Sequence, residues 1–432
     1  MHKSLIMSLL YASLTVCAAI LLTASKACSE EPARASHPAA KGMRVIDNEE
    51  DDLLRKITVI SPGVYEAVIT SATGGGIPEF YDLTREDQAK TNLTQPSRGL
   101  LEIGWHSSEI SKEGKPWIAD WPSAYHMRLK TPAAMEVIEQ GPARVRVQVK
   151  TPFTFWDEKV YENTCVTCVY TFYPAGRIVS KVNIEYNEDR TFNWSREYGP
   201  HLYLYHDRKT PASQPFDIRT PKIDSLVDEP DAPAEQLVMA YPTTPEIRTS
   251  FFITIPIEAQ KRFSHSMRHT AHALNWVRGG YGSANVKMTK GFTDEWACMI
   301  QMGTKGSPLL KEFKSPKEAI PFANDYREPA KLSDAELVKD DEGDFNKDGF
   351  NESQGCYVIS ADGPAVSITY EKGETAGFAP AFKIVNWKGV APVGVTIDGK
   401  NMPAAISLTN GNLIVSILGE ITGKKAMIKI GQ

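Results

Sequence analysis

The sequence has few cysteines, no excess of basic residues and no second long apolar run. Its six cysteines are scattered over 432 residues, which is too sparse a pattern for a disulfide framework. The net charge of -5 comes from interspersed acidic and basic residues, so there is no basic stripe for nucleic acid. These absences exclude a disulfide scaffold and nucleic-acid binding, and they leave an N-terminal anchor as the only expected contact with a membrane.

The N-terminus has the three-part layout of a secretory signal peptide. A positively charged start is followed by an apolar run from about Leu5 to Leu22 and by small residues before a cleavage site after Ala27. The alternatives are an uncleaved membrane anchor, because the run approaches the roughly 18 residues of a span, and a lipid anchor on Cys28. We predict a signal peptide over 1–27, a flexible leader over 28–45, and a secreted or periplasmic location.

An alternation of apolar and polar residues predicts β-strands from Ile57 to Asn187. Val145, Val147 and Val149 alternate with polar residues that begin at Arg144, so the valines are expected to face a core and Arg144 to face water. Strong helix patterns are absent from this region.

Two further alternating runs, Cys168–Tyr173 and Ile178–Ile184, flank a Pro/Gly turn and predict a hairpin. Cys165 and Cys168 have the spacing of a zinc or redox site, but residues three apart on a strand point to opposite faces. Ordinary packing of these two cysteines is therefore favoured over metal or redox chemistry.

The second half mixes loops, short helices and strands. Residues 207–246 are rich in Pro, Asp and Thr and are interpreted as surface loops. Helices are predicted from Ser315, with Pro316 in the first turn, and from the capping box that begins at Ser333. Near the C-terminus, Asn410-Gly411 between two alternating runs predicts a hairpin.

One stretch resembles a known architecture. Gly74–Leu83, with its Phe-Tyr-Asp-Leu strand, is followed by Asn92-Leu93 and by Arg98–His106. Together with the Phe-Tyr-Pro-x-Gly-Arg hairpin, they resemble the galactose-mutarotase-like β-supersandwich domains of carbohydrate-active enzymes, which include polysaccharide lyases. The resemblance covers Ile57 to Gln301 and implies large antiparallel sheets.

The predicted fold class is all-β, with a large antiparallel β-supersandwich followed by a small C-terminal β-sandwich. About 390 residues remain after the leader, too many for one small core. We place the supersandwich at 46–360 and the C-terminal sandwich at 361–432.

The residues around 193–206 carry the first candidate active site. A polysaccharide lyase needs a group that neutralises the uronate carboxylate, a base that removes the adjacent proton, and an acid that protonates the leaving oxygen. Arg196, His201 and Tyr198 are candidates for these roles in that order, and His106 is a fourth catalytic candidate. The alternative interpretation is a plain strand from His201 to His206 with one wet face.

Aromatic residues and one histidine are candidates for substrate binding, because aromatic faces stack on the apolar faces of sugar rings. These residues are Trp105, Trp121, Tyr125, His126, Trp194 and Tyr203.

Residues 344–352 resemble a calcium-binding loop. The oxygen donors of its first, third, fifth, seventh and ninth positions are supplied by Asp344, Asn346, Asp348, the carbonyl of Phe350, and Glu352. Gly355 stands where the bidentate glutamate of such loops occurs, so another ligand or weak binding is implied. We predict a structural calcium ion; a turn without metal is the alternative.

The predicted function is that of an exported polysaccharide lyase that cleaves an acidic, uronate-containing glycan by β-elimination. The alternatives are a non-catalytic glycan-binding or surface protein and a glycoside hydrolase. For the hydrolase, Glu102, Asp120 and Glu197 lie near the aromatic clusters. A polysaccharide is the expected partner.

Overall fold

The structure is a computed structural model, and all of its described residues belong to one unit, Pro38–Gln432. The described residues are 42–48, 55–84, 91–94, 99–109, 123–125, 133–154, 160–202, 204, 216–219, 237–242, 247–257, 267–270, 273–278, 286–390 and 393–431. The predicted signal peptide lies outside them, as does most of the leader. In these ranges, no helix is both long enough and apolar enough to cross a membrane.

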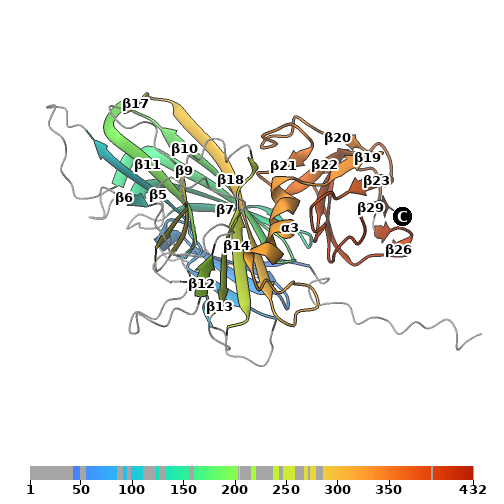
Figure 1. Cartoon of the computed structure of the whole chain (residues 1–432). Coiled ribbons are helices and arrows are strands. Elements are labelled where there is room, and N and C mark those ends of the chain that lie inside the picture. The colour runs from blue at the N-terminus through green and yellow to red at the C-terminus, as the bar shows by residue number, and fades with distance from the viewer. Residues whose placement is uncertain are drawn as a thin grey trace, which may run out of the picture. The chain divides into compact units, whose positions relative to one another are not determined.

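The described residues are mostly strand, which confirms the all-β prediction (Figure 1). A first antiparallel sheet contains β1 (Arg44–Asn48), β2 (Lys56–Ser61), β3 (Tyr65–Thr70) and β4 (Glu79–Asp82), with the short 3-10 helix η2 (Ser71–Thr73) after β3. Residues 44 and 45, which the predicted leader includes, lie in β1, and Met43 before them is buried.

A second sheet has fourteen strands within the described ranges. Their order is β12 (Phe216–Arg219), β13 (Val238–Pro242), β14 (Thr249–Thr254), β18 (Phe292–Thr304), β10 (Arg177–Tyr186), β9 (Val160–Phe172), β8 (Val145–Thr154), β6 (Ser123–Tyr125), β5 (Leu100–Glu109), β11 (Arg190–Leu202), β16 (Ala273–Arg278) and β15 (Met267–Thr270). Two more strands complete it: β7 (Ala134–Gln140) pairs with β8, and β17 (Val286–Met288) pairs with β11.

The C-terminal strands form two smaller sheets. One has the order β19 (Lys331–Ser333), β23 (Ala365–Glu371), β29 (Lys425–Gly431), β25 (Gly394–Ile397) and β26 (Lys400–Asn401). The other has the order β20 (Glu336–Leu337), β22 (Cys356–Ser360), β24 (Ala381–Val385), β28 (Asn412–Ile417) and β27 (Ala404–Thr409), with β21 (Phe350–Asn351) beside β22. Strands β19 to β22 of these two sheets precede residue 361.

Two hairpins agree with the sequence prediction. The predicted turn after Tyr173 joins β9 to β10, with Phe172 opposite Ile178. Asn410 and Gly411 both have positive φ, 52° and 74°, and they join β27 to β28 as a two-residue turn. Both turns formed as predicted because their signals are local: positive φ suits the right-handed twist of the flanking strands.

The prediction of loops over 207–246 is wrong in two places, because β12 and β13 lie there and pair with each other. Met239 in β13 is fully buried. The composition of the region does suit loops, but a short strand needs only a partner, and β14 supplies it for β13. Local composition does not reveal which segment will pair with a strand.

One predicted helix forms and the other does not. Helix α3 (Pro316–Arg327) begins after Ser315, whose hydroxyl accepts a hydrogen bond from the backbone N–H of Glu318 at 3.4 Å. At the predicted capping box, Ser333 ends β19 and Glu336 begins β20, with a turn between them at Asp334 (φ 62°). Pairing with β23 and β22 overrides the capping signal there.

At β8 and β14, the fourteen-stranded sheet has buried side chains on both of its faces. On one face, Val145, Val147 and Val149 are fully buried in a cluster with side chains of the first sheet such as Val59 and Phe80. The other face contributes residues such as Phe252 to a cluster that includes α3 and the C-terminal sheets. The alternation of the valines is confirmed.

The prediction that Arg144 faces water is wrong, because its side chain is only 2% exposed. Its guanidinium donates to both carboxylate oxygens of Glu139, at 2.7 and 2.8 Å, and to the Cys356 Sγ at 3.5 Å. Cys356 belongs to the C-terminal sandwich, so Arg144 is covered by a part of the chain more than two hundred residues away, whereas Lys150, the last polar residue of the same alternation, is exposed as predicted.

The cysteines of the Cys165-to-Cys168 spacing show the packing role that was favoured. Cys168 is buried and Cys165 is half-buried, and both are free thiols. Burial raises the pKa of the Cys168 thiol to about 12. A thiol that stays protonated is a poor nucleophile and metal ligand.

Asp325 in α3 is a buried carboxylate that makes stability depend on pH. It accepts hydrogen bonds from the backbone N–H groups of Gly377 (2.7 Å) and Phe378 (3.0 Å). Burial raises its pKa to about 6, against the opposing effect of Arg177. Because the pKa of Asp325 is higher in the folded state than in the unfolded state, the folded state holds the proton more tightly. The contribution of Asp325 to stability therefore falls as the pH rises from about 4 to about 6.

Replacing Asp325 by asparagine should remove that pH dependence. The stability difference between wild type and Asp325→Asn should favour wild type by about 2 kcal/mol more at pH 4 than at pH 7, measured by urea unfolding at both pH values. The control is Asp398→Asn, because the Asp398 carboxylate also accepts a backbone N–H, from Met427, but at an exposed site. An equal difference at both pH values for Asp325→Asn would contradict the assignment.

Candidate functional site

The four candidate catalytic residues lie on β5 and β11, which are neighbouring antiparallel strands (Figure 1). Arg196 is directly opposite His106, and Tyr198 is directly opposite Gly104. Directly opposed residues in an antiparallel pair share one face of the sheet. The register therefore places the Arg196, Tyr198 and His106 positions on a common face.

A β-bulge adds the His201 position to this face. Tyr198 and His201 are three residues apart, so regular alternation would put them on opposite faces. The register shifts between them, and His201 is opposite Glu102, two residues beyond Gly104 on β5. The shift falls at Gly199-Pro200, where proline cannot donate to a regular ladder. All four candidate catalytic positions consequently lie on one face.

The candidate substrate-binding residues divide into three groups. Tyr125 on β6 is opposite Gly104, and Trp194 is opposite Ser108, so both positions share the face of the catalytic candidates. Trp105 is opposite Glu197 and lies on the other face. Trp121, His126 and Tyr203 lie outside the described residues.

Two residues flank the His201 position on the same sheet. Glu102 is opposite His201 on β5, and Asn275 is opposite it on β16. From the sequence, Glu102 was a candidate only as a hydrolytic acid, and Asn275 was not a candidate. Only the pairing of β11 with β16 brings Asn275 beside His201, and no local sequence pattern predicts this pairing.

The calcium-like loop, residues 344–352, is a tight turn closed by its own hydrogen bonds. The Asp344 carboxylate accepts from the backbone N–H of Lys347 at 2.6 Å and of Gly349 at 2.8 Å. Gly349 has φ 96°, and a Cβ there would lie 2.8 Å from the Leu337 Cβ, so glycine is required at this position. The loop thus turns sharply at the place where a calcium loop does.

The remaining oxygen donors are held in the same way. Asn346 Oδ1 accepts from the Asp348 N–H at 2.9 Å, and Asp348 Oδ1 accepts from the Phe350 N–H at 2.7 Å. Glu352 is 2% exposed and accepts from the Phe345 N–H at 2.8 Å. Burial raises the pKa of Glu352 to about 8.

The donor set suits a hard cation, although the donor atoms do not surround a common centre. Each carboxylate has about four lone-pair sites, so the three N–H groups accepted by Asp344 and the single N–H accepted by Asp348 and by Glu352 leave capacity for an ion. Within the described ranges, however, no three Asp, Glu, His or Cys side chains are close enough together to form a metal-binding group. Binding would require the donors to move toward a common centre.

No family model matches the chain, and no curated protein matches it. Solved structures do match: YidC from Thermotoga maritima has 11% identity and a TM-score of 0.26, over 61% of this chain and 51% of YidC. A putative aldose 1-epimerase from Escherichia coli has 9% identity and a TM-score of 0.32, over 61% and 100% of the two chains. A polysaccharide lyase has 10% identity and a TM-score of 0.28, over 82% of this chain and 44% of the lyase.

The chain therefore spans about half the length of that YidC and less than half of that lyase. At these TM-scores and identities the similarities assign neither an activity nor a partner. The functional argument depends on the residues of the chain itself.

Proposed function

We propose that this chain is an exported enzyme that cleaves a uronate-containing polysaccharide by β-elimination. The observation that carries the proposal is the register of β5 and β11, which puts the Arg196, Tyr198, His201 and His106 positions on one face. Residues at these positions with a cation, a phenol and two imidazoles would supply the three functions that the reaction needs.

Each residue has a defined role in the proposed reaction. Arg196 neutralises the uronate carboxylate and thereby stabilises the negative charge that develops when the adjacent carbon loses its proton. His201 takes that proton. The electron pair of the broken C–H bond forms the new C=C bond, the C–O bond to the leaving sugar breaks, and Tyr198 protonates the leaving oxygen. The products are an unsaturated uronate and a new reducing end.

The proposal is tested by incubating the purified mature chain with a panel of uronate-containing polysaccharides. Ultraviolet absorbance of the unsaturated product and the number of reducing ends should rise together on at least one substrate. Reducing ends without the absorbance gain would identify a glycoside hydrolase instead. Measurable binding with neither signal would identify a non-catalytic glycan-binding protein.

We further propose that the calcium-like loop binds a structural calcium ion. The support is its donor set, in which three carboxylates, one amide oxygen and one carbonyl occupy the positions of a calcium loop around Gly349. The ion would connect the loop to the adjoining strand β22.

Calcium should raise the melting temperature of the protein, and chelation should lower it. At a calcium concentration one hundred times the dissociation constant, the stabilisation is about 2.7 kcal/mol. Differential scanning fluorimetry with calcium or EGTA measures the shift, and Asp344→Asn should reduce it. Asp398→Asn serves as an aspartate control outside the loop. An unchanged melting temperature after chelation rules out a stabilising ion.

A further inference from the structure

A row of four positions crosses the fourteen-stranded sheet at the His201 end of the candidate active site. Glu102 on β5 is directly opposite His201 on β11. Across the next two pairings, His201 is opposite Asn275 on β16, and Asn275 is opposite Arg268 on β15. All three pairings are antiparallel, and directly opposed residues of an antiparallel pair share one face. The register therefore adds the Arg268 position to the face that carries the catalytic candidates.

The positions that flank Arg268 on this face of β16 carry no charge. Asn275 is directly opposite it, and Ala273 and Val277 are the diagonal neighbours on either side of Asn275. A charged residue on a sheet interacts most strongly with the positions opposite and diagonal to it. The positive charge of Arg268 therefore has no acidic neighbour on the strand with which β15 pairs.

A second arginine nearby has the opposite arrangement. Arg278, also close to the end of the sheet, is directly opposite Glu197 on β11. That pair lies on the other face, together with Trp105. Opposite charges at directly opposed positions neutralise each other. Of these two arginines, Arg268 is consequently the one whose register position leaves its charge for a ligand.

The position of Arg268 suits a sugar other than the one that loses its proton. β16 separates β15 from β11 in the sheet. Neighbouring strands lie about 4.8 Å apart, so the Cα atoms of Arg268 and His201 are about 10 Å apart. This separation exceeds the length of one sugar ring. Glu102, on the other side of His201, would repel an anion, so the charged sugar is expected toward β15.

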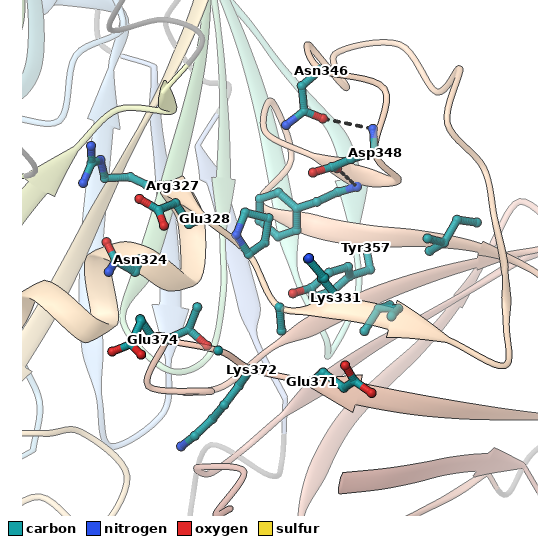
Figure 2. A pocket seen from close by; sticks show the side chains of 17 residues that line it. Asn324, Arg327, Glu328, Lys331, Asn346, Asp348, Tyr357, Glu371, Lys372 and Glu374 are labelled. Atoms are coloured by element: carbon teal, nitrogen blue, oxygen red, sulfur yellow. Dashed lines mark hydrogen bonds between the residues drawn. The ribbon is translucent and has the colours of Figure 1, made fainter. Parts of the chain in front are cut away.

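The pocket beside the calcium-like loop makes no such selection between charges. It has a volume of about 740 Å³ and lies between the end of α3, which contributes Asn324, the loop, and the turn after β23 (Figure 2). Its lining combines Lys331 and Lys372 with Asp348 and Glu374. Charges of both signs in one lining favour neither an anion nor a cation.

We propose that Arg268 forms a second binding site for an anionic sugar of the polysaccharide on which His201 acts. The anionic group is a carboxylate or a sulfate ester, to which arginine donates charge-assisted hydrogen bonds. The role of His201 in this proposal rests on the proposed lyase function, whereas binding at Arg268 needs no catalytic step. The substrate accordingly carries negative charge on at least two of its sugars.

Kinetics on a uronate-containing polysaccharide separate binding at Arg268 from catalysis. Arg268→Gln should raise KM about ten- to hundredfold, the loss expected for a hydrogen bond to a charged group. Its kcat should stay within a few-fold of wild type, because the proposed acid and base are unchanged. Arg268→Lys keeps the positive charge and should recover part of the affinity. The matched control is Arg278→Gln, on the other face, which should keep the wild-type KM.

Calorimetric titration with tetrasaccharides identifies the anionic group without relying on cleavage. The probes are tetragalacturonate, which carries only carboxylates, a chondroitin sulfate tetrasaccharide, which also carries sulfate esters, and neutral cellotetraose. His201→Ala is the background, so that turnover does not interfere. Adding Arg268→Gln should weaken binding of tetragalacturonate at least tenfold if the group is a carboxylate, and of the sulfated probe alone if it is a sulfate ester. Binding of cellotetraose should not change.

The results distinguish failure of this inference from failure of the lyase proposal. If wild type cleaves a uronate polymer and Arg268→Gln keeps the wild-type KM and Kd, the inference is overturned and the lyase proposal stands. If wild type cleaves nothing, but an acidic tetrasaccharide binds and Arg268→Gln loses that binding, the lyase proposal fails and the anionic site stands. Absence of binding of both acidic probes at millimolar concentration overturns the inference, as does an equal loss in Arg278→Gln. Melting temperatures verify folding, and Arg268→Lys decides the test if Arg268→Gln is destabilised.

Discussion

Replacing His201 by alanine should lower kcat on a uronate-containing polysaccharide by about 10²- to 10⁴-fold, the usual contribution of a positioned general base. The expectation follows from the bulge after Tyr198, which places the His201 position opposite Glu102 and on the face of Arg196. Absorbance assays at saturating substrate measure kcat directly. Tyr198→Phe, which removes only the proposed acid, should have an effect in the same range.

The matched control is Ser195→Ala. Ser195 is on the same strand, next to Arg196, but its register position opposite Ser107 lies on the other face of the sheet. Its activity should stay within a few-fold of wild type, and all three variants should melt at the wild-type temperature. Full activity in His201→Ala would move the active site to another part of the molecule.

Arg144→Met should destabilise the protein by about 3–5 kcal/mol, the cost of breaking a buried ion pair from one side. Methionine keeps much of the volume of arginine but leaves the Glu139 carboxylate, whose side chain is 10% exposed, without its bidentate partner. Arg146, at 3.8 Å from Glu139, compensates only weakly. Chemical denaturation gives the free energy of unfolding.

Two further variants isolate the cause. Adding Glu139→Gln to Arg144→Met removes the unpaired charge and should recover part of the loss. Arg55→Met breaks a comparable pair with Asp47, at 2.9 Å, whose side chains are 20% and 23% exposed. It should cost less than Arg144→Met, because solvent screens that pair. Equal losses for the two arginines would contradict the role assigned to burial.

The local signals of the sequence predicted the elements that depend on a few adjacent residues. The alternation around Val147 marked a strand with one buried face, and the turns after Tyr173 and at Asn410-Gly411 marked hairpins. Ser315 with Pro316 marked the start of α3. In each case the side chains or backbone angles that stabilise the element lie within it.

Predictions that depended on distant partners were less successful. The capping box at Ser333 offered a helix start, but pairing with β22 and β23 made strands of its two ends. Residues 207–246 have the composition of loops, yet β13 pairs with β14. A local preference of a few tenths of a kcal/mol yields to the hydrogen bonds and burial of a sheet.

The candidate catalytic residues were chosen from the sequence by residue type alone. Alternation read from the chain would have separated Tyr198 from His201, and nothing near Asn275 suggested a place beside His201. The pocket at Asn324 was also not predicted, because its walls come from α3, the calcium-like loop and the turn after β23.

By itself, the sequence determined the all-β class, the two hairpins, the start of α3 and the set of residues able to carry acid–base chemistry, because these follow from side-chain periodicity and local backbone preference. Only the tertiary structure decided that Arg144 is buried and that the β5 and β11 positions share a face. The physical reason is the same for both: burial and strand register are set by which segments pair, and those segments are far apart in the chain.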